Sequence, residues 1–361
     1  MPKRSNTAVI CFSPYFGGME MDAFRIAKLL SKSVETTLIV KHASQMDRHY
    51  RDEAKKENIR FESINFLSTL SPSIIFNTRK TLTKHNIKNI IFFGASEMIS
   101  LYFSFLGLDI NLIIRHGTTK SSPKKDFLHR ILYSNVNYHI AICEHIATNV
   151  KHIIPFGPNA KVKVIYSSLR HPVKNLPKPH YHTEPLITLL HVARITDGKG
   201  QIDAIKACET LLSNNIQFKF ICVGELDPDY ADRFNAFIAK LPYKSSIELP
   251  GYTTDVSEYL KSSDIFIFPS KGEGLSNSFI EALSYGLVCI SYKNTSFPEL
   301  KQAGFKFFMA ENGDINDLKV CLSRAVDYLR THEIPLLNNT KLAQELFGEQ
   351  RELAELIEIL K

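Results

Sequence analysis

Short apolar runs alternate with helix-length polar segments along nearly all of this 361-residue chain. In the first half, the runs with the length of a β-strand are Ala8–Ser13, Thr37–Lys41, Ile59–Ile64, Asn89–Gly94, Leu112–Arg115, His139–Cys143 and Val162–Ser167. In the second half they are Ile187–Ala193, Phe218–Val223, Ser246–Leu249, Ile265–Pro269, Val288–Ser291 and Lys306–Met309. Apolar strands joined by helical crossovers are typical of parallel sheets that helices cover on both faces. The pattern therefore predicts an α/β protein.

A proline-rich stretch divides the pattern in two. Residues 171–185 contain four prolines, which disfavour a helix and favour a linker. A chain of this length can form two domains that each bury a core. We therefore expect two Rossmann-like domains, over residues 1–175 and 176–340. The tail, residues 341–361, has Leu, Ile and Glu at helical spacing and is predicted to be one long amphipathic helix.

The composition is that of an ordinary soluble protein, with 44% apolar and 22% charged residues. The longest apolar stretches, Ile87–Phe93 and Leu101–Leu108, are far shorter than the roughly 20 residues that cross a bilayer. No signal-peptide pattern precedes the first strand, so we expect a cytoplasmic protein. The six cysteines are scattered without a C-x-x-C pair and are expected to be reduced core residues.

Charge is unevenly distributed between the two halves. Residues 1–175 hold 25 Lys and Arg against 12 Asp and Glu, whereas residues 176–361 hold 19 against 25. Basic clusters at Lys120–Lys125 and Arg48–Arg51 would attract anionic lipid headgroups at about 1 kcal/mol per cation, which predicts peripheral contact with the inner face of a membrane. A phosphorylated acceptor, or a solvated basic face without a partner, remains an alternative. Nucleic acid is not expected as a partner, because the chain shows no helix-turn-helix, zinc or aromatic RNA-binding signature.

Two carboxylates eight positions apart, Glu273 and Glu281, lie in the segment Ser270–Glu281, which follows an apolar run and leads into a predicted helix. A strand, a glycine-containing turn and a helix together place unpaired backbone N–H groups and the positive end of the helix dipole at one spot, which suits a phosphate. A carboxylate beside an anion is unfavourable unless it accepts hydrogen bonds from hydroxyl groups, and sugars supply these. The segment therefore indicates a phosphorylated, polyhydroxylated ligand such as a nucleotide sugar.

Two cations follow the strand Ile187–Ala193. Arg194 and Lys199 are five positions apart on a turn that contains Asp197 and Gly198. Such a pair can converge on a diphosphate, with Arg as a two-pronged donor and Lys as a mobile point charge. If a nucleoside diphosphate leaves, the two cations would stabilise the charge that develops on it.

Other candidates follow strands of the first half. Gly17 and Gly18 would let the backbone approach a substrate closely, although an ordinary β–α turn is the alternative. His116 ends the strand Leu112–Arg115, where either a direct role or a structural one is open. The dinucleotide fingerprint G-x-G-x-x-G is absent, which disfavours a dehydrogenase.

The remaining histidines give no metal signal. His171, His180 and His182 stand at irregular spacing in the linker and are expected to be solvated. The chain has no H-E-x-x-H motif or carboxylate triad, so we expect neither a catalytic metal nor another cofactor.

Glu273 and Glu281, with Gly274, Leu275 and Ser276 after the first of them, resemble the E-x7-E signature of retaining GT-B-fold glycosyltransferases of the glycogen-synthase and bacterial lipopolysaccharide type. Three further matches occur in the family's order: Gly17-Gly18, Arg194 with Lys199-Gly200, and Pro298-Glu299-Leu300. The resemblance implies two facing Rossmann-like domains with a cleft between them, and a terminal helix that crosses back to the first domain. One departure is Gly286-Leu287-Val288-Cys289, where the family usually has a proline.

The resemblance also implies an activity and a set of roles. A hexose-type sugar would pass from a nucleoside diphosphate sugar, UDP-sugar favoured, to a glycan or glycolipid acceptor in cell-surface polysaccharide or lipopolysaccharide synthesis. Donor contacts would come from Gly17, Gly18, Tyr252, Gly274, Leu275, Ser276 and Glu281. Catalytic contacts would come from His116, Arg194, Lys199 and Glu273. Glu299 is given no catalytic part.

Two other classes of function remain open at this stage. A same-fold epimerase or phosphorylase would use different acid and base groups or a pyridoxal lysine, and no lysine here stands out for that cofactor. A non-catalytic relic would bind nucleotide without turning it over.

Overall fold

The computed structural model describes residues 6–173, 175 and 180–360, and these form two compact units. Unit 1 runs to Ser167 and takes up the C-terminal segment from Glu349, whereas unit 2 spans Ser168–Gly348. No helix among the described residues is long and apolar enough to cross a membrane.

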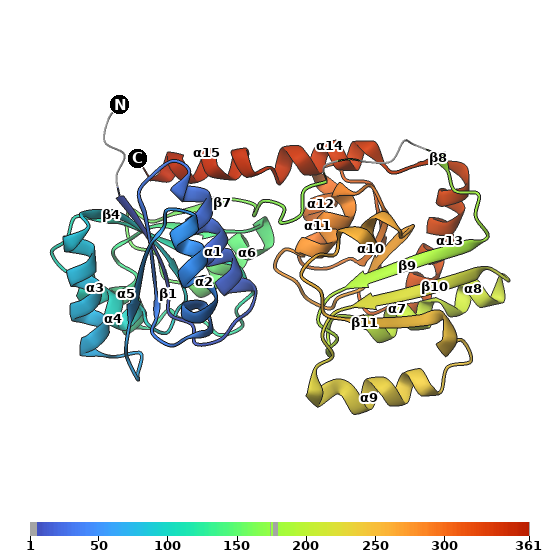
Figure 1. The fold of residues 1–361 in the computed structure, drawn as a ribbon, viewed down its shortest axis with the longest axis horizontal. Helices are drawn as coiled ribbons and strands as arrows, with labels where there is room; N and C mark the ends of the chain where they lie inside the picture. Colours follow the sequence, from blue (N-terminus) through green and yellow to red (C-terminus); the bar gives the residue numbers. More distant parts are fainter. Residues whose placement is uncertain (1–5, 174, 176–179, 361) are drawn as a thin grey trace. The chain divides into compact units, whose positions relative to one another are not determined.

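Unit 1 is built on a seven-stranded parallel sheet with the order β3-β2-β1-β4-β5-β6-β7 (Figure 1). Its strands are β1 Asn6–Cys11, β2 Thr36–Lys41, β3 Arg60–Ile64, β4 Ile87–Phe93, β5 Asn111–His116, β6 Val136–Ala141 and β7 Lys161–Val164. Its helices are α1 Gly18–Ser31, α2 Gln45–Lys56, α3 Pro72–Lys84, α4 Met98–Phe105, α5 Phe127–Leu132, α6 Glu144–Ile153 and α15 Glu349–Ile359. One core joins Val9 and Ile91 of the central strands to Phe24 of α1 and Leu356 of α15.

Unit 2 contains a six-stranded parallel sheet with the order β11-β10-β9-β12-β13-β14. Its strands are β9 Leu186–Val192, β10 Gln217–Val223, β11 Ile247–Gly251, β12 Ile265–Phe268, β13 Val288–Tyr292 and β14 Phe308–Ala310. Its helices are α7 Gln201–Ala207, α8 Glu209–Ser213, α9 Pro228–Ala239, the 3-10 turn Lys244–Ser246, α10 Ser257–Lys261, α11 Asn277–Ser284, α12 Phe297–Gln302, α13 Ile315–Thr331 and α14 Leu337–Leu346. A short antiparallel ribbon pairs β8 His180–Tyr181 with β15 Glu333–Ile334.

Both sheets confirm the predicted doubly wound architecture, and each of the thirteen predicted strands overlaps a strand of the structure. The order of the strands reverses between β1 and β4 in unit 1 and between β9 and β12 in unit 2. In open α/β sheets, ligands bind beyond the carboxyl ends of the strands at such a reversal. The fold therefore directs attention to the segments that follow β9 and β12.

The prediction of one long tail helix from residue 341 is wrong, because the structure has two helices, α14 and α15. They are separated at Phe347 and Gly348, where a Cβ added to the glycine would lie 2.5 Å from the carbonyl oxygen of Gln344. The boundary between the units also precedes the proline-rich stretch, at Ser167 and Ser168. The amphipathic periodicity continues across the break between α14 and α15, so it cannot reveal that break.

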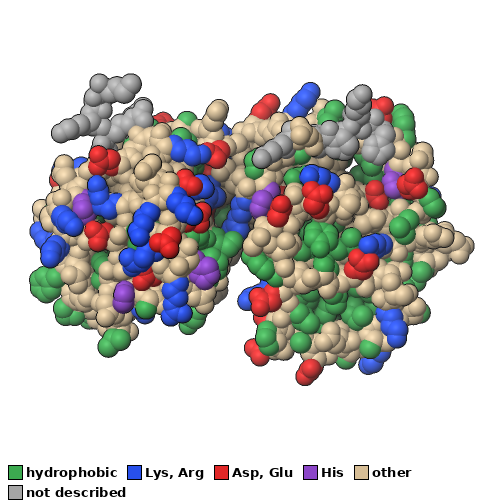
Figure 2. Space-filling model, in the orientation of Figure 1, with side chains coloured by type: hydrophobic (Ala, Val, Ile, Leu, Met, Phe, Trp, Pro, Cys, Tyr) green, Lys and Arg blue, Asp and Glu red, His purple; other side chains and the backbone are tan. Residues whose placement is uncertain are grey.

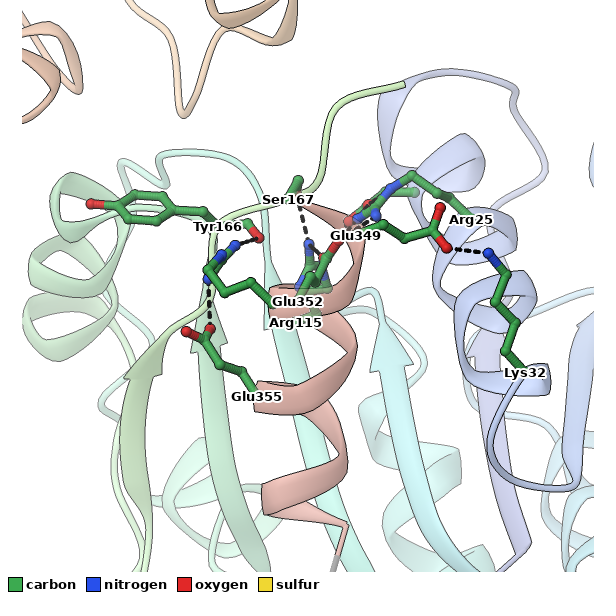
Figure 3. A network of polar contacts seen from close by, with 10 residues as sticks. Arg25, Lys32, Arg115, Tyr166, Ser167, Glu349, Glu352 and Glu355 are labelled. Carbon is green, nitrogen blue, oxygen red and sulfur yellow. Dashed lines mark hydrogen bonds and ion pairs between the residues drawn. The ribbon is translucent and has the colours of Figure 1, made fainter. Parts of the chain in front are cut away.

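A buried group of charges holds α15 against unit 1 (Figure 3). Glu352 is fully buried; its Oε2 lies 2.5 Å from Nη1 of Arg25, and its Oε1 lies 3.1 Å from Nη2 of Arg115. Both arginines also contact Asp22, and Nη2 of Arg115 donates to Ser167 at 2.7 Å. Burial alone would raise the pKa of Asp22, but Arg115 and Arg25 outweigh it and lower that pKa to about 2.

Candidate functional site

The segment after β12 has the local structure that its sequence predicts. Ser276 is the N-cap of α11, and its Oγ accepts a hydrogen bond from the backbone N–H of Phe279. Glu273 lies in the preceding turn, and Glu281 lies inside the helix and is buried. The two carboxylates therefore stand on either side of the N-terminus of α11.

Lys199 and Glu273 meet across two loops at the carboxyl ends of β9 and β12. Nζ of Lys199 lies 2.5 Å from Oε1 of Glu273, and Ser270 also donates to that oxygen at 3.1 Å. The backbone N–H of Lys271 donates to the carbonyl of Gly198 at 2.8 Å, which ties the loops together. The structure thus brings one predicted cation and one predicted carboxylate to the same place.

Gly200 makes this approach possible. It has φ +83°, and a Cβ built on it would lie only 2.1 Å from the carbonyl oxygen of Pro269. Any larger residue would be strained there and would clash with the backbone that follows β12. The glycine therefore allows the loop that carries Lys199 to lie against the end of β12.

His191, which the sequence analysis did not single out, supports the same loop from inside the sheet. It is fully buried in β9, and its Nε2 lies 3.0 Å from the carbonyl oxygen of Lys199. A carbonyl only accepts, so Nε2 carries a proton, and the ring is neutral at pH 7 because its pKa is low. Burial is the main cause that lowers the pKa of His191, to about 4.

We expect His191 to make the protein less stable in acid. Its pKa is about 4 in the folded state against an ordinary 6.5, so below pH 6.5 the unfolded chain binds the proton more readily. As the pH falls toward the folded pKa, unfolding becomes progressively more favourable. Between pH 7.5 and pH 5 the free energy of unfolding falls by about 2 kcal/mol. Urea denaturation at both values should show a smaller loss for His191→Phe than for wild type. The control His152→Phe, at an exposed position, should lose as much stability as wild type. Equal losses of stability in all three proteins would show that His191 does not cause the acid sensitivity.

Glu281 has a partner that the sequence analysis did not predict. Nδ1 of His171 lies 3.2 Å from Oε1 of Glu281, and this hydrogen bond is the main cause that raises the pKa of His171. The expectation that the linker histidines are simply solvated is therefore wrong for His171. It is also wrong for His182, which is mostly buried and lies 3.3 Å from Asp264. The side chain of His180 lies outside the described residues.

A cavity of about 530 Å³ adjoins His171 within unit 2. Its other lining residues include Arg170, Asp255, Lys261 and Tyr285. Because His171 contacts both this cavity and Glu281, the cavity and the second carboxylate of the signature belong to one region of unit 2.

Two other predicted residues of unit 2 are exposed. The Arg194 side chain is 65% exposed and lies 4.0 Å from Asp227, so its described ion pair is not with the group around Lys199. Tyr252 follows β11 and is 67% exposed, which leaves its ring free to stack on a planar ligand. Leu275 is buried, and Gly274 lies in the turn before α11.

The candidates in unit 1 lie at the carboxyl edge of its sheet. Gly17 is the N-cap of α1, Gly18 is the first residue of that helix, and His116 is the last residue of β5. His116 is buried and its Nε2 lies 3.0 Å from Nδ1 of His139. Burial is the main cause that lowers the pKa of His116 well below its ordinary value, so the ring is neutral at pH 7.

The described residues contain no group of three or more His, Cys, Asp or Glu side chains arranged to hold a metal ion. The six cysteines are free and buried. The polar groups brought together in unit 2 are thus a cation beside a carboxylate, a buried carboxylate held by a histidine, and a capped helix N-terminus. This set can bind a phosphate and hydroxyl groups side by side.

Residues 173–327 match the family model described as glycosyl transferases group 1, and this part of the chain is a glycosyltransferase domain of that group. The domain covers the sheet of unit 2 and the loops of Lys199 and Glu273. It confirms the resemblance to glycosyltransferases that the sequence motifs indicated.

Known proteins agree with this classification. The chain is 26% identical over 302 residues to the capsular polysaccharide biosynthesis glycosyltransferase CapH of Staphylococcus aureus, a match that covers 79% of this chain and 81% of that protein. It is 27% identical over 186 residues to the amylovoran biosynthesis glycosyltransferase AmsK of Erwinia amylovora, covering 48% of this chain and 45% of AmsK. The chain spans about half the length of the first curated relatives it matches.

Among solved structures, Anabaena HepE in complex with UDP and glucose superimposes with a TM-score of 0.75 at 15% identity, over 98% of both chains. A likeness at this identity shows the fold, which is the two-domain GT-B fold of glycosyltransferases.

Proposed function

We propose that the chain is a retaining glycosyltransferase that moves a hexose from a UDP-sugar to a glycan or lipid-linked acceptor in cell-surface polysaccharide synthesis. The observation that carries the proposal is the meeting of Lys199 and Glu273 at the carboxyl ends of β9 and β12, within a glycosyltransferase domain. The names of CapH and AmsK support the polysaccharide product, and the UDP and glucose bound to HepE support the donor class.

In this proposal, unit 2 binds the donor. Lys199 and Arg194 contact the diphosphate, and the backbone from Gly274 to Ser276 contacts the sugar together with Glu273. Oε1 of Glu281 accepts from His171, which leaves Oε2 to accept a ribose hydroxyl. Tyr252 lies on the side of the nucleobase.

The chemical step breaks the bond between the anomeric carbon and the diphosphate, and the electron pair leaves with the diphosphate. The acceptor hydroxyl attacks from the face that the diphosphate leaves, so that configuration is retained, and a phosphate oxygen takes the hydroxyl proton. Lys199 and Arg194 stabilise the charge that develops on the leaving group. His116, Gly17 and Gly18 serve the acceptor side or the donor sugar, and the step needs no metal or other cofactor.

The test is a thermal-shift panel with UDP, GDP, ADP, CMP and NAD. A ligand that binds only the folded protein stabilises it by about 2.7 kcal/mol at 100 times its dissociation constant. We expect UDP to raise the Tm of wild type and of the control Glu248→Ala, in which the lost carboxylate is exposed on β11, but not of Glu281→Ala or Glu281→Gln. A response to GDP alone would show that the donor carries guanine in place of uracil. No response to any nucleotide would refute the donor site.

A relic would bind UDP without turnover, so the same proteins should next be incubated with UDP-sugars. Release of UDP by wild type supports the enzyme. Binding without release, with and without lipid-linked acceptors, would favour the relic.

A further inference from the structure

An exposed apolar helix face lies next to the basic segment that follows β5. On α5, Phe127 is 79% exposed, Leu128 is 50% exposed and Ile131 is 36% exposed. These positions are one, three and four residues apart and therefore lie on one side of the helix. Helix α4, which packs against α5, carries exposed Phe103, and the residue that follows α4, Leu106, is also exposed. Gathered apolar side chains of this kind mark a binding surface rather than scattered exposure.

The surroundings of this face are basic. Among the described residues, Lys120, Lys124, Lys125 and Arg130 form no ion pair within 4.0 Å, in contrast to Arg25, Arg51, Arg115 and other basic residues of unit 1. Asp126 caps α5 and is bound to His129, and the charge of Lys124 acts on Glu97. Lys and Arg side chains are also frequent over the face of unit 1 drawn at the left of Figure 2.

The segment is fixed in place rather than loosely attached. The backbone N–H of Lys124 donates to the carbonyl of Ile153 at 2.8 Å. The side chain of Asn149 exchanges two hydrogen bonds of 2.9 Å with the backbone of Lys120. Burial, and then the charge of Lys124, lower the pKa of Lys120 to about 8, so an anion at this place would relieve the crowding of the cations.

We infer that residues 120–132 dock unit 1 onto an anionic lipid bilayer, with Phe127, Leu128 and Ile131 inserted among the headgroups and Lys120, Lys124, Lys125 and Arg130 over the phosphates. Burial of the apolar side chains and attraction of the cations to the phosphates both favour binding. Both contributions are needed, because either alone gives weak and reversible binding. A second copy of the chain would not favour this face, since four cations would meet four cations.

The inference goes beyond the transfer reaction and is tested without measuring it. The purified protein is mixed with vesicles of phosphatidylcholine alone, or of phosphatidylcholine with about 30% of the anionic lipid phosphatidylglycerol, and the bound fraction is measured by flotation. We expect binding to the anionic vesicles that 0.5 M salt releases. Phe127→Ser combined with Leu128→Ser should weaken it at least about tenfold, since 1.4 kcal/mol is a factor of ten.

Matched variants separate the alternatives. Phe76→Ser, at a 70% exposed residue of α3, should bind vesicles like wild type. Lys124→Gln with Lys125→Gln should lose the preference for anionic lipid. Equal binding to both vesicle types, or unchanged binding by both double variants, overturns the inference. If light scattering shows a dimer, and the variant with Phe127→Ser and Leu128→Ser is a monomer, the inference is also overturned, because the face then binds a second copy of the chain.

Discussion

Turnover of the UDP-sugar should fall about 100- to 1000-fold when Lys199 is replaced by Ala, which is the usual effect of removing one donor to a developing negative charge. The ammonium group lies 2.5 Å from Glu273 at the place where the strand order of unit 2 reverses. The ammonium group carries a full charge, which no backbone group at that place does. The measurement is the rate of UDP release at saturating donor.

The control is Lys271→Ala, which removes an exposed lysine from the loop on the other side of the same contact. Its backbone N–H, which bonds Gly198, is unaffected by the substitution. Glu273 keeps its hydrogen bond from Ser270 in Lys199→Ala, so the Tm should change little in either variant. Full turnover by Lys199→Ala, or an equal loss in both variants, would remove Lys199 from the reaction.

The partner of the Arg194 side chain could not be predicted from the sequence. Its spacing from Lys199 suggested that both cations converge, yet its described ion pair is with Asp227. Spacing along a turn limits how far apart the backbone atoms of two residues are. A long exposed side chain, however, can reach several different partners. The predicted convergence on a diphosphate therefore stays a prediction that a bound donor must test.

The strands were predictable because their cause is local. A run such as Ile265–Phe268 is apolar and buried on both faces, which only a sheet covered by helices accommodates. The capped start of α11 was equally readable, because Ser276 precedes the helix directly. The contacts of His171 with Glu281 and of His191 with Lys199 join residues whose pairing no periodicity encodes.

The same reason explains why the charge group around Glu352 was not predicted. Glu352 lies 327 positions from Arg25 and 237 from Arg115 in the chain. In the sequence it is one glutamate among several on an amphipathic helix. Only the return of the chain to unit 1 at Glu349 makes it a buried residue.

Replacing Glu352 by Ala should destabilise the protein by about 3–5 kcal/mol, because removing one partner of a buried ion pair leaves charges without compensation. Arg115 is itself buried and, among the described residues, would keep Asp22 and Ser167 as side-chain partners. Urea denaturation followed by circular dichroism measures the change. Glu358→Ala on the same helix removes an exposed pair with Lys163 and should cost less than about 1 kcal/mol.

Acid should weaken the same contact in wild type. Burial would raise the pKa of Glu352, but Arg25 and Arg115 outweigh it, so its folded pKa lies below the ordinary 4.5, as that of Asp22 lies at about 2 against 3.8. The unfolded chain therefore takes up these protons first, and the stabilisation is complete above pH 4.5 and is lost as pH falls toward 2. The free energy of unfolding of Glu352→Ala should therefore fall less in acid than that of wild type. If instead Glu352→Ala and Glu358→Ala were equally stable at pH 7, the buried charges would not be what holds α15 to unit 1.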